Sequence, residues 1–181
     1  MNWPRFLALV CAVYVTALCS HSRLKAQAAH GAQNNSDVLH VAVTASDGSR
    51  ILLKRYAGHP LWVNFFATWC PPCLIELPDI ERRYLLNKEK DLIVIGIDQQ
   101  EDAATVAKFV QTQHLTFPIV TDTDGSVAES FHLKTLPSSI FIDANGIVRE
   151  NHSGQIMPDD MDLALAKILN ENDRITALPT P

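Results

Sequence analysis

The chain has 181 residues, with 20 acidic and 15 basic side chains, and therefore a formal net charge of −5. Hydrophobic residues make up 47 % of it, which is enough to bury the core of one ordinary domain. The acidic balance and the absence of a Lys/Arg cluster argue against nucleic-acid binding, because proteins that bind nucleic acid concentrate positive charge on one surface.

The first 28 residues predict a secretory signal. Arg5 precedes a mostly apolar run from Phe6 to Leu18, and the A-x-A pattern Ala26–Ala28 follows it. The apolar run is shorter than the roughly 20 residues that a membrane-spanning helix needs. We therefore expect residues 1–28 to be a cleaved signal, with an uncleaved anchor as the alternative, and the mature protein to be exported to the periplasm.

After a flexible lead-in at residues 29–37, strand and helix patterns alternate. The predicted strands are Leu39–Thr44, Ile51–Leu53, Leu61–Phe66, Leu92–Ile97, Ile119–Thr121, Ser139–Ile142 and Val148–His152. The predicted helices are Cys73–Asn87, Ala103–Gln113, Val127–Phe131 and Asp159–Asn170. This order predicts one α/β layered domain over residues 38–172, a central mixed sheet flanked by helices, with a frayed tail at 173–181.

Two cysteines stand two residues apart where the strand Leu61–Phe66 passes into the next helix. Cys70 is expected at the helix N-terminus, where free N–H groups and the helix dipole stabilise a thiolate. Pro71 and Pro72 suit the first helical turn, because an N–H there has no intrahelical partner to lose. The pattern therefore predicts a redox-active Cys70/Cys73 pair.

Three other interpretations of this pair are weaker. A structural zinc site needs four ligands, but the only other cysteines are Cys11 and Cys19 in the signal segment. Haem attachment needs a histidine after the second cysteine, where Leu74 stands. A purely structural disulfide remains open, although closing so small a loop stabilises a fold little.

Four segments resemble a known family. They are Val63–Pro78 (VNFFATWCPPCLIELP), Ile95–Asp98 (IGID), Phe117–Asp122 (FPIVTD) and Leu136–Gly146 (LPSSIFIDANG). The chain is similar, from Val38 to Leu169, to the TlpA/ResA-like exported thiol–disulfide oxidoreductases. The resemblance implies a thioredoxin fold with a strand–helix element inserted around Ile93–Gln113. It also implies activity without a cofactor other than the cysteine disulfide, and without a metal.

The resemblance assigns roles to individual residues. It makes Cys70 the attacking thiolate, with its sulfur exposed, and Cys73 the buried resolving thiol. It places Leu136 and Pro137 in a cis-proline loop that faces the cysteines and shapes the substrate site. Thr135 departs from the family, which often has a glycine there, so the loop and its substrate preference are left open.

Glu76 and Trp69 complete the predicted site. Thioredoxin carries a buried aspartate six residues before its first cysteine, but this chain has Asn64 there, which does not titrate. Glu76 follows Cys73 by one helical turn and matches a glutamate of the family, so it is expected to accept a proton, with a pKa raised by burial. The alternative is a solvated helix glutamate. Trp69 is expected to lie beside the disulfide, with a core position as the alternative.

The expected partners are envelope proteins with cysteine pairs, a membrane thiol–disulfide electron donor and no nucleic acid, and a monomer is expected. Two alternative functions remain open. One is a peroxiredoxin-type peroxidase, which this chain fits poorly because Ala67 stands where that class has a threonine. The other is a copper carrier with Cys70 and Cys73 as Cu(I) ligands, although no motif positions a histidine to complete the site.

Overall fold

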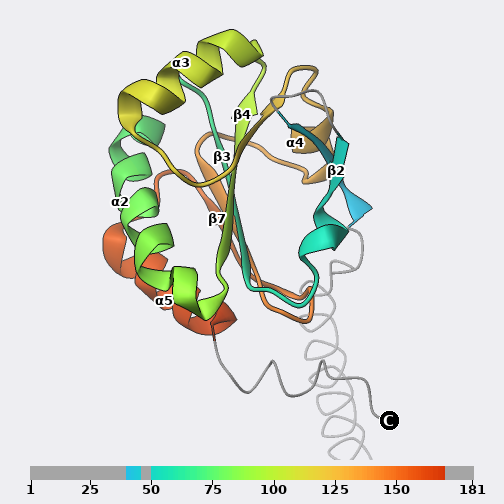
Figure 1. Ribbon diagram of the computed structural model, residues 1–181, viewed down its shortest axis with the longest axis vertical. Helices are drawn as coiled ribbons and strands as arrows, with labels where there is room; N and C mark the ends of the chain where they lie inside the picture. The colour runs from blue at the N-terminus through green and yellow to red at the C-terminus, as the bar shows by residue number, and fades with distance from the viewer. Residues whose placement is uncertain (1–39, 46–49, 170–181) are drawn as a thin grey trace, which may run out of the picture. The chain divides into compact units, whose positions relative to one another are not determined.

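Seven strands form a single sheet in the order β2-β1-β5-β4-β3-β6-β7 in the computed structural model, which describes residues 40–45 and 50–169. The strands are β1 (Ala42–Ala45), β2 (Arg50–Leu52), β3 (Leu61–Phe66), β4 (Ile93–Gln99), β5 (Ile119–Asp122), β6 (Ser138–Ile142) and β7 (Val148–Ser153). The α-helices are α2 (Pro71–Asn87), α3 (Ala103–Gln113), α4 (Ser126–Ser130) and α5 (Pro158–Ile168), and 3₁₀ turns occur at η2 (Leu53–Tyr56) and η3 (Lys88–Lys90) (Figure 1).

The centre of the sheet is parallel and its margins are antiparallel. β3 pairs parallel with β4, and β4 pairs parallel with β5, whereas β6 and β1 join the sheet antiparallel. All six residues of β3 are buried, as expected for a strand covered on both faces. The predicted mixed α/β sheet is therefore confirmed.

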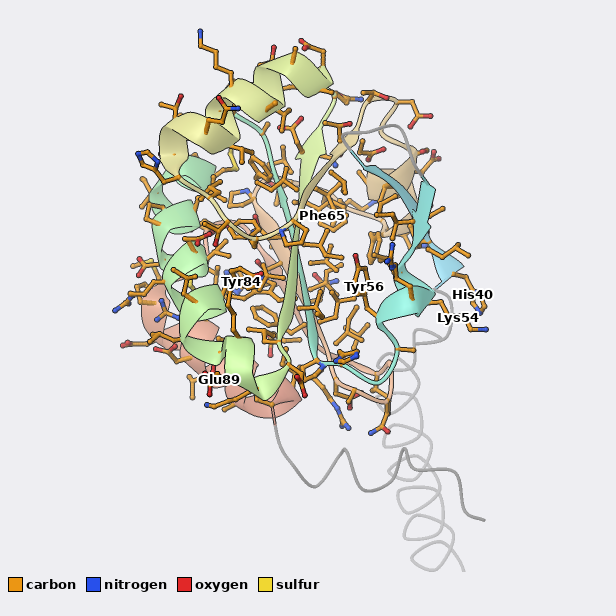
Figure 2. All side chains as sticks on the ribbon, viewed as in Figure 1. His40, Lys54, Tyr56, Phe65, Tyr84 and Glu89 are labelled. Atoms are coloured by element: carbon orange, nitrogen blue, oxygen red, sulfur yellow. A yellow bond between two sulfur atoms is a disulfide. The ribbon has the colours of Figure 1, made fainter. Side chains whose placement is uncertain are left out.

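Alternate residues of the central strands fill two separate cores. Trp62 and Phe66 face a cluster that receives side chains from α2, α3 and α5, whereas Phe65 faces a second cluster with side chains from η2 and α4. Figure 1 shows α2, α3 and α5 on one side of the sheet and α4 on the other, and in Figure 2 Tyr84 lies on the α2 side and Tyr56 on the opposite side. This layering brings α2, which begins directly after the cysteine loop, against the face that carries Trp62 and Phe66.

All seven predicted strands and four predicted helices are present; Leu61–Phe66 and Ala103–Gln113 have the predicted bounds, and the others differ at one or both ends. α2 begins two residues earlier than predicted because Pro71 and Pro72 occupy its first two positions, and Pro158 likewise begins α5. β4 continues to Gln99, two residues past the predicted end. The two 3₁₀ turns were not predicted.

The predicted signal, lead-in and tail, at 1–28, 29–37 and 173–181, lie outside the described residues. Within 40–45 and 50–169, no helix combines the length and the apolarity needed to cross a bilayer.

A buried arginine ties α2 to α5. The Arg83 side chain is 4 % exposed, and its Nε and Nη2 donate to the two carboxylate oxygens of Asp162 at 2.7 and 2.8 Å. Its Nη2 also donates to the carbonyl of Pro158, the first residue of α5, at 2.7 Å. A bidentate pair of this kind fixes geometry as well as contributing energy. It therefore sets how α5 lies against the helix that carries the cysteines.

We predict that Arg83→Ala lowers the free energy of unfolding by about 2–3 kcal/mol, because it removes charge-assisted hydrogen bonds and buried methylene packing together. Arg82→Ala is the matched control, since Arg82 is exposed, pairs only with Asp79 of its own helix in the described contacts, and is expected to cost less than about 0.5 kcal/mol. Urea denaturation of both variants measures this, and equal losses would show that the α2–α5 tie is not formed.

Candidate active site

The two cysteines of the Cys-x-x-Cys pair are joined by a disulfide at the start of α2. β3 ends at Phe66, and a three-residue loop leads to Cys70, which caps the helix with extended backbone angles. The Cys70 carbonyl accepts a hydrogen bond from the Leu74 amide at 3.2 Å, the first of the helix. Cys70 therefore lies at the helix N-terminus, as predicted, where a thiolate is stabilised by the helix dipole once the disulfide is reduced.

Burial distinguishes the two sulfur-bearing residues only slightly in the disulfide form. Cys70 is 4 % exposed and Cys73 is 0 % exposed. Cys70 is therefore the more exposed of the two cysteines, as predicted. The prediction that it is exposed is wrong, because both residues belong to the buried cluster beneath α2. In the disulfide form, the small exposed fraction therefore belongs to Cys70.

Glu76 is buried one helical turn after Cys73 and is bonded to two other elements. Its Oε1 accepts a hydrogen bond from Asn64 Nδ2 of β3 at 2.8 Å, and its Oε2 accepts one from the Ile156 amide before α5 at 2.9 Å. Its exposed fraction is 2 %, so the alternative of a solvated helix glutamate is wrong. The carboxyl group lies on the face of α2 that also buries Cys73.

Burial makes this carboxyl group a weak acid. Desolvation raises the pKa of Glu76 to about 7, against smaller lowering effects of the hydrogen bonds from Ile156 and Asn64 and of the charge of His152. The raised pKa was predicted, and it gives Glu76 comparable populations of both protonation states at neutral pH. Such a group can both accept and return a proton.

Asn64 is placed to serve both protonation states of Glu76. Besides donating to Glu76, its Nδ2 lies 3.1 Å from Ser139 Oγ, which also accepts a hydrogen bond from Trp62 Nε1 at 2.9 Å. Its Oδ1 has no hydrogen-bond partner among the described residues. Rotating the amide by 180° would present that oxygen to a protonated Glu76. The polar contact can therefore persist when Glu76 gains a proton.

The remaining predicted site residues lie in the cysteine loop and in the loop before β6. Trp69 is 65 % exposed, so the core alternative for it is wrong, and Ile75 on the first turns of α2 is 63 % exposed. The peptide bond between Leu136 and Pro137 is cis, as the resemblance implies. Leu136 packs against the cluster that contains both cysteines, and the Pro137 carbonyl accepts a hydrogen bond from the Gly154 amide at 2.8 Å.

Several residues of the site were not identified from the sequence. His152, which no sequence motif singled out, acts electrostatically on Glu76. Asp98 lies in the last residues of the central parallel strand β4, and Glu101 follows its end, a position where polar side chains often form sites; that signal could have identified them. Glu101 contacts Thr68 in the cysteine loop with both carboxylate oxygens.

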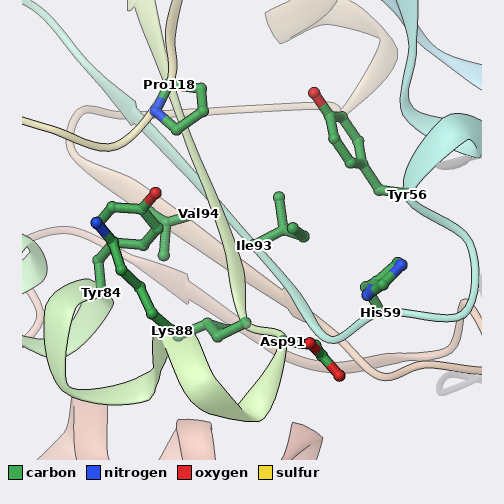
Figure 3. Close-up of a pocket in the computed structure, with 9 residues that line it drawn as sticks. Tyr56, His59, Tyr84, Lys88, Asp91, Ile93, Val94 and Pro118 are labelled. Carbon is green, nitrogen blue, oxygen red and sulfur yellow. The ribbon is translucent and has the colours of Figure 1, made fainter.

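A separate pocket lies at the far end of the sheet and includes none of these residues. It is lined by Tyr56, His59, Tyr84, Lys88, Asp91, Leu92, Ile93, Val94 and Pro118 (Figure 3). β3 and β4 are parallel, so the start of β4, which lines this pocket, lies at one end of the sheet. The end of β3 that leads to the cysteines lies at the other end. In the described part of the chain, no group of three or more His, Cys, Asp or Glu side chains is arranged to hold a metal ion.

Comparison with known proteins gives a consistent result. Residues 35–151 match the model of the AhpC/TSA family. The thiol–disulfide oxidoreductase ResA of Bacillus thuringiensis subsp. konkukian is 33 % identical over 126 residues, which cover 70 % of this chain and 73 % of that protein.

Solved structures show the same fold. A thioredoxin-family thiol:disulfide interchange protein from Chlorobium tepidum superimposes with a TM-score of 0.64 at 27 % identity, covering 72 % of this chain and 93 % of that one. The structure of MTB dsbF in mixed oxidised and reduced forms gives a TM-score of 0.67 at 24 % identity, covering 73 % and 97 %. The thioredoxin fold is thereby confirmed.

We predict that Glu76 makes stability depend on pH. Because folding raises its pKa from 4.5 to about 7, the folded state holds a proton that the unfolded state has lost between these values. The free energy of unfolding of the oxidised protein should therefore fall from pH 4.5 to 7, by at most about 3 kcal/mol from this group. Glu76→Gln should lack that fall. Urea denaturation at pH 4.5 and 8 tests this, and parallel profiles for the two proteins would contradict it.

Proposed function

Because the chain belongs to the AhpC/TSA family, and within it to the ResA-like thiol–disulfide oxidoreductases, we propose that its Cys70/Cys73 dithiol reduces disulfides of exported proteins. The observation that carries the proposal is the cysteine pair at the N-terminus of α2 with the buried Glu76 carboxyl group one turn away. A structural disulfide would not require a carboxyl group that titrates near neutral pH beside it.

The first step is an attack by Cys70. Its thiolate attacks one sulfur of the substrate disulfide, forms a mixed disulfide and expels the other substrate sulfur as a thiolate. Cys73 then attacks the Cys70 sulfur, which closes the Cys70–Cys73 bond and expels the second substrate thiolate. Two electrons pass from the protein to the substrate, and the substrate thiolates take up protons from solvent.

Glu76 supplies the base for the second step. Cys73 is fully buried, so its proton cannot pass directly to water, and only the thiolate is an effective nucleophile. The ionised carboxyl group of Glu76 accepts that proton. Its pKa near 7 is close to that of a thiol, so the transfer is nearly balanced in energy.

Exposed apolar side chains beside the cysteines provide the substrate surface. Trp69, directly before Cys70, and Ile75, after it in α2, are both largely exposed. Leu136 lies in the cis-proline loop. A substrate segment that carries apolar residues next to its cysteine pair would cover them. Apocytochrome thiol pairs and copper-site proteins are the substrate classes that we favour.

The proposed location follows from the sequence. Residues 1–28 are proposed as the export signal and residues 38–172 as the redox domain of a monomeric protein. In an oxidising compartment a dithiol stays reduced only if a donor restores it, so a membrane thiol–disulfide donor is part of the proposal. Removal of the signal would leave Cys70 and Cys73 as the only thiols, so the exchange partner must be another molecule.

We predict opposite behaviour of the two single cysteine variants. Cys70→Ser should lose reduction of a disulfide-containing peptide, because the attacking sulfur is gone. Cys73→Ser should still attack and then accumulate as a mixed disulfide, because the resolving sulfur is missing. Intact-mass spectrometry after mixing with the peptide measures both. The double variant is the control and should trap nothing, and a trapped adduct on Cys73 in Cys70→Ser would reverse the assigned roles.

A further inference from the structure

A second buried acid lies at the end of β4, on the far side of β3 from β6. Asp98 is 0 % exposed and lies between Phe66 of β3 and Thr121 of β5 in the sheet register. In the described part of the chain, neither of its carboxyl oxygens has a hydrogen-bond partner of good distance and angle, although the Glu101 amide acts on the group as a weak donor. A buried ionised carboxylate with so little hydrogen bonding is costly, so this group must be accounted for by its neighbours.

The neighbour is Glu101, which holds the cysteine loop. One Glu101 oxygen accepts a hydrogen bond from the Thr68 amide at 2.6 Å and the other accepts one from Thr68 Oγ1 at 2.7 Å. Thr68 is two residues before Cys70 and next to Trp69. The Glu101 side chain also interacts directly with the Asp98 carboxyl group. Two carboxyl groups form a hydrogen bond only when one of them carries a proton.

Burial and the charges around Asp98 favour that proton. Desolvation, followed by hydrogen bonding with the Glu101 side chain and its like charge, raises the pKa of Asp98 to about 8 against a smaller lowering effect of the Glu101 amide, and Asp102 adds a further like charge. Lys108, the cation of α3, is exposed, and the arginines of α2 are paired with aspartates of α2 and α5. Asp122 of β5 accepts amide hydrogen bonds from α4, and Glu76 is bonded to β3 and to the segment before α5.

We propose that Asp98 is a positioning residue: its protonated carboxyl group donates a hydrogen bond to Glu101, and Glu101 in turn fixes the Thr68 backbone before Cys70. The inference deepens the proposed function, since the loop that it fixes carries the attacking sulfur. Loss of the Asp98 proton places a buried carboxylate beside the partly buried carboxylate of Glu101, and their repulsion releases Thr68. The redox loop is therefore ordered at neutral pH and loosened at alkaline pH.

The test follows the Thr68 amide signal of the oxidised, ¹⁵N-labelled protein by NMR from pH 5 to 9. The disulfide form is used because neither cysteine titrates in it, and a Glu76→Gln background removes the other carboxyl group that titrates near neutral pH. The signal should shift with a midpoint near pH 8. Asp98→Asn keeps a donor toward Glu101 and cannot titrate, so it should abolish the shift and hold the neutral-pH position throughout.

Two further variants complete the test. Asp102→Asn is the matched control, because it removes the neighbouring acid without touching Thr68 and should keep the transition at a lower midpoint. Asp98→Ala removes the donor and the titrating charge together, so it should also abolish the transition. A transition near pH 8 that persists in Asp98→Asn or in Asp98→Ala overturns the proposal. The NMR signal does not depend on turnover, so failure of the proposed disulfide reduction would appear separately, as wild-type protein without exchange activity.

Discussion

The site depends on one buried carboxyl group held between three elements. Glu76 projects from α2, accepts a hydrogen bond from Asn64 in the middle of β3, and accepts another from the Ile156 amide just before α5. These contacts fix the rotation of α2, and with it the position of Cys73 on the buried face of the helix. Burial opposes ionisation of the group, whereas its two donors favour ionisation, and the balance leaves its pKa near 7. A fully apolar side chain at this point would leave the buried donors of Asn64 and Ile156 without an acceptor and could not receive a proton.

A buried carboxyl group with a raised pKa occurs on both sides of β3. On the β6 side, Glu76 is the group that we propose accepts the Cys73 proton during resolution. On the β4 side, we place Asp98 and Glu101 behind the loop that carries Cys70. Desolvation keeps each acid partly or wholly protonated at neutral pH. Because each folded-state pKa is raised, the free energy of unfolding falls as pH rises. Proteins retain such costly groups mainly where they serve function. The hydrogen bonds from Arg83 of α2 to α5 help to fix the position of α2 relative to α5.

The sequence predicted the parts of this structure that follow from local pattern. The apolar run at Leu61–Phe66 followed by Cys-Pro-Pro-Cys predicts a central strand that ends at a helix N-terminus, and Glu76 is found by counting one turn from Cys73. Ile156, His152 and Ser139 could not be placed, because they reach the site through pairing of β6 with β3 and through the path of the chain before α5. Asp98 was visible only as the last letter of a family motif. Its significance comes from burial and from Glu101, which local pattern does not reveal.

The most direct test of the central claim is the rate at which Cys73 resolves the mixed disulfide, measured by rapid mixing of reduced protein with a disulfide peptide across pH 5 to 9. If Glu76 is the proton acceptor, Glu76→Gln should slow resolution by about 10²-fold and remove its pH dependence near 7, since general base help is typically of that size. The alkylation rate of Cys70 should change much less. Resolution profiles that superimpose for the wild type and Glu76→Gln would contradict the account and leave Glu76 as a buried residue that serves packing alone.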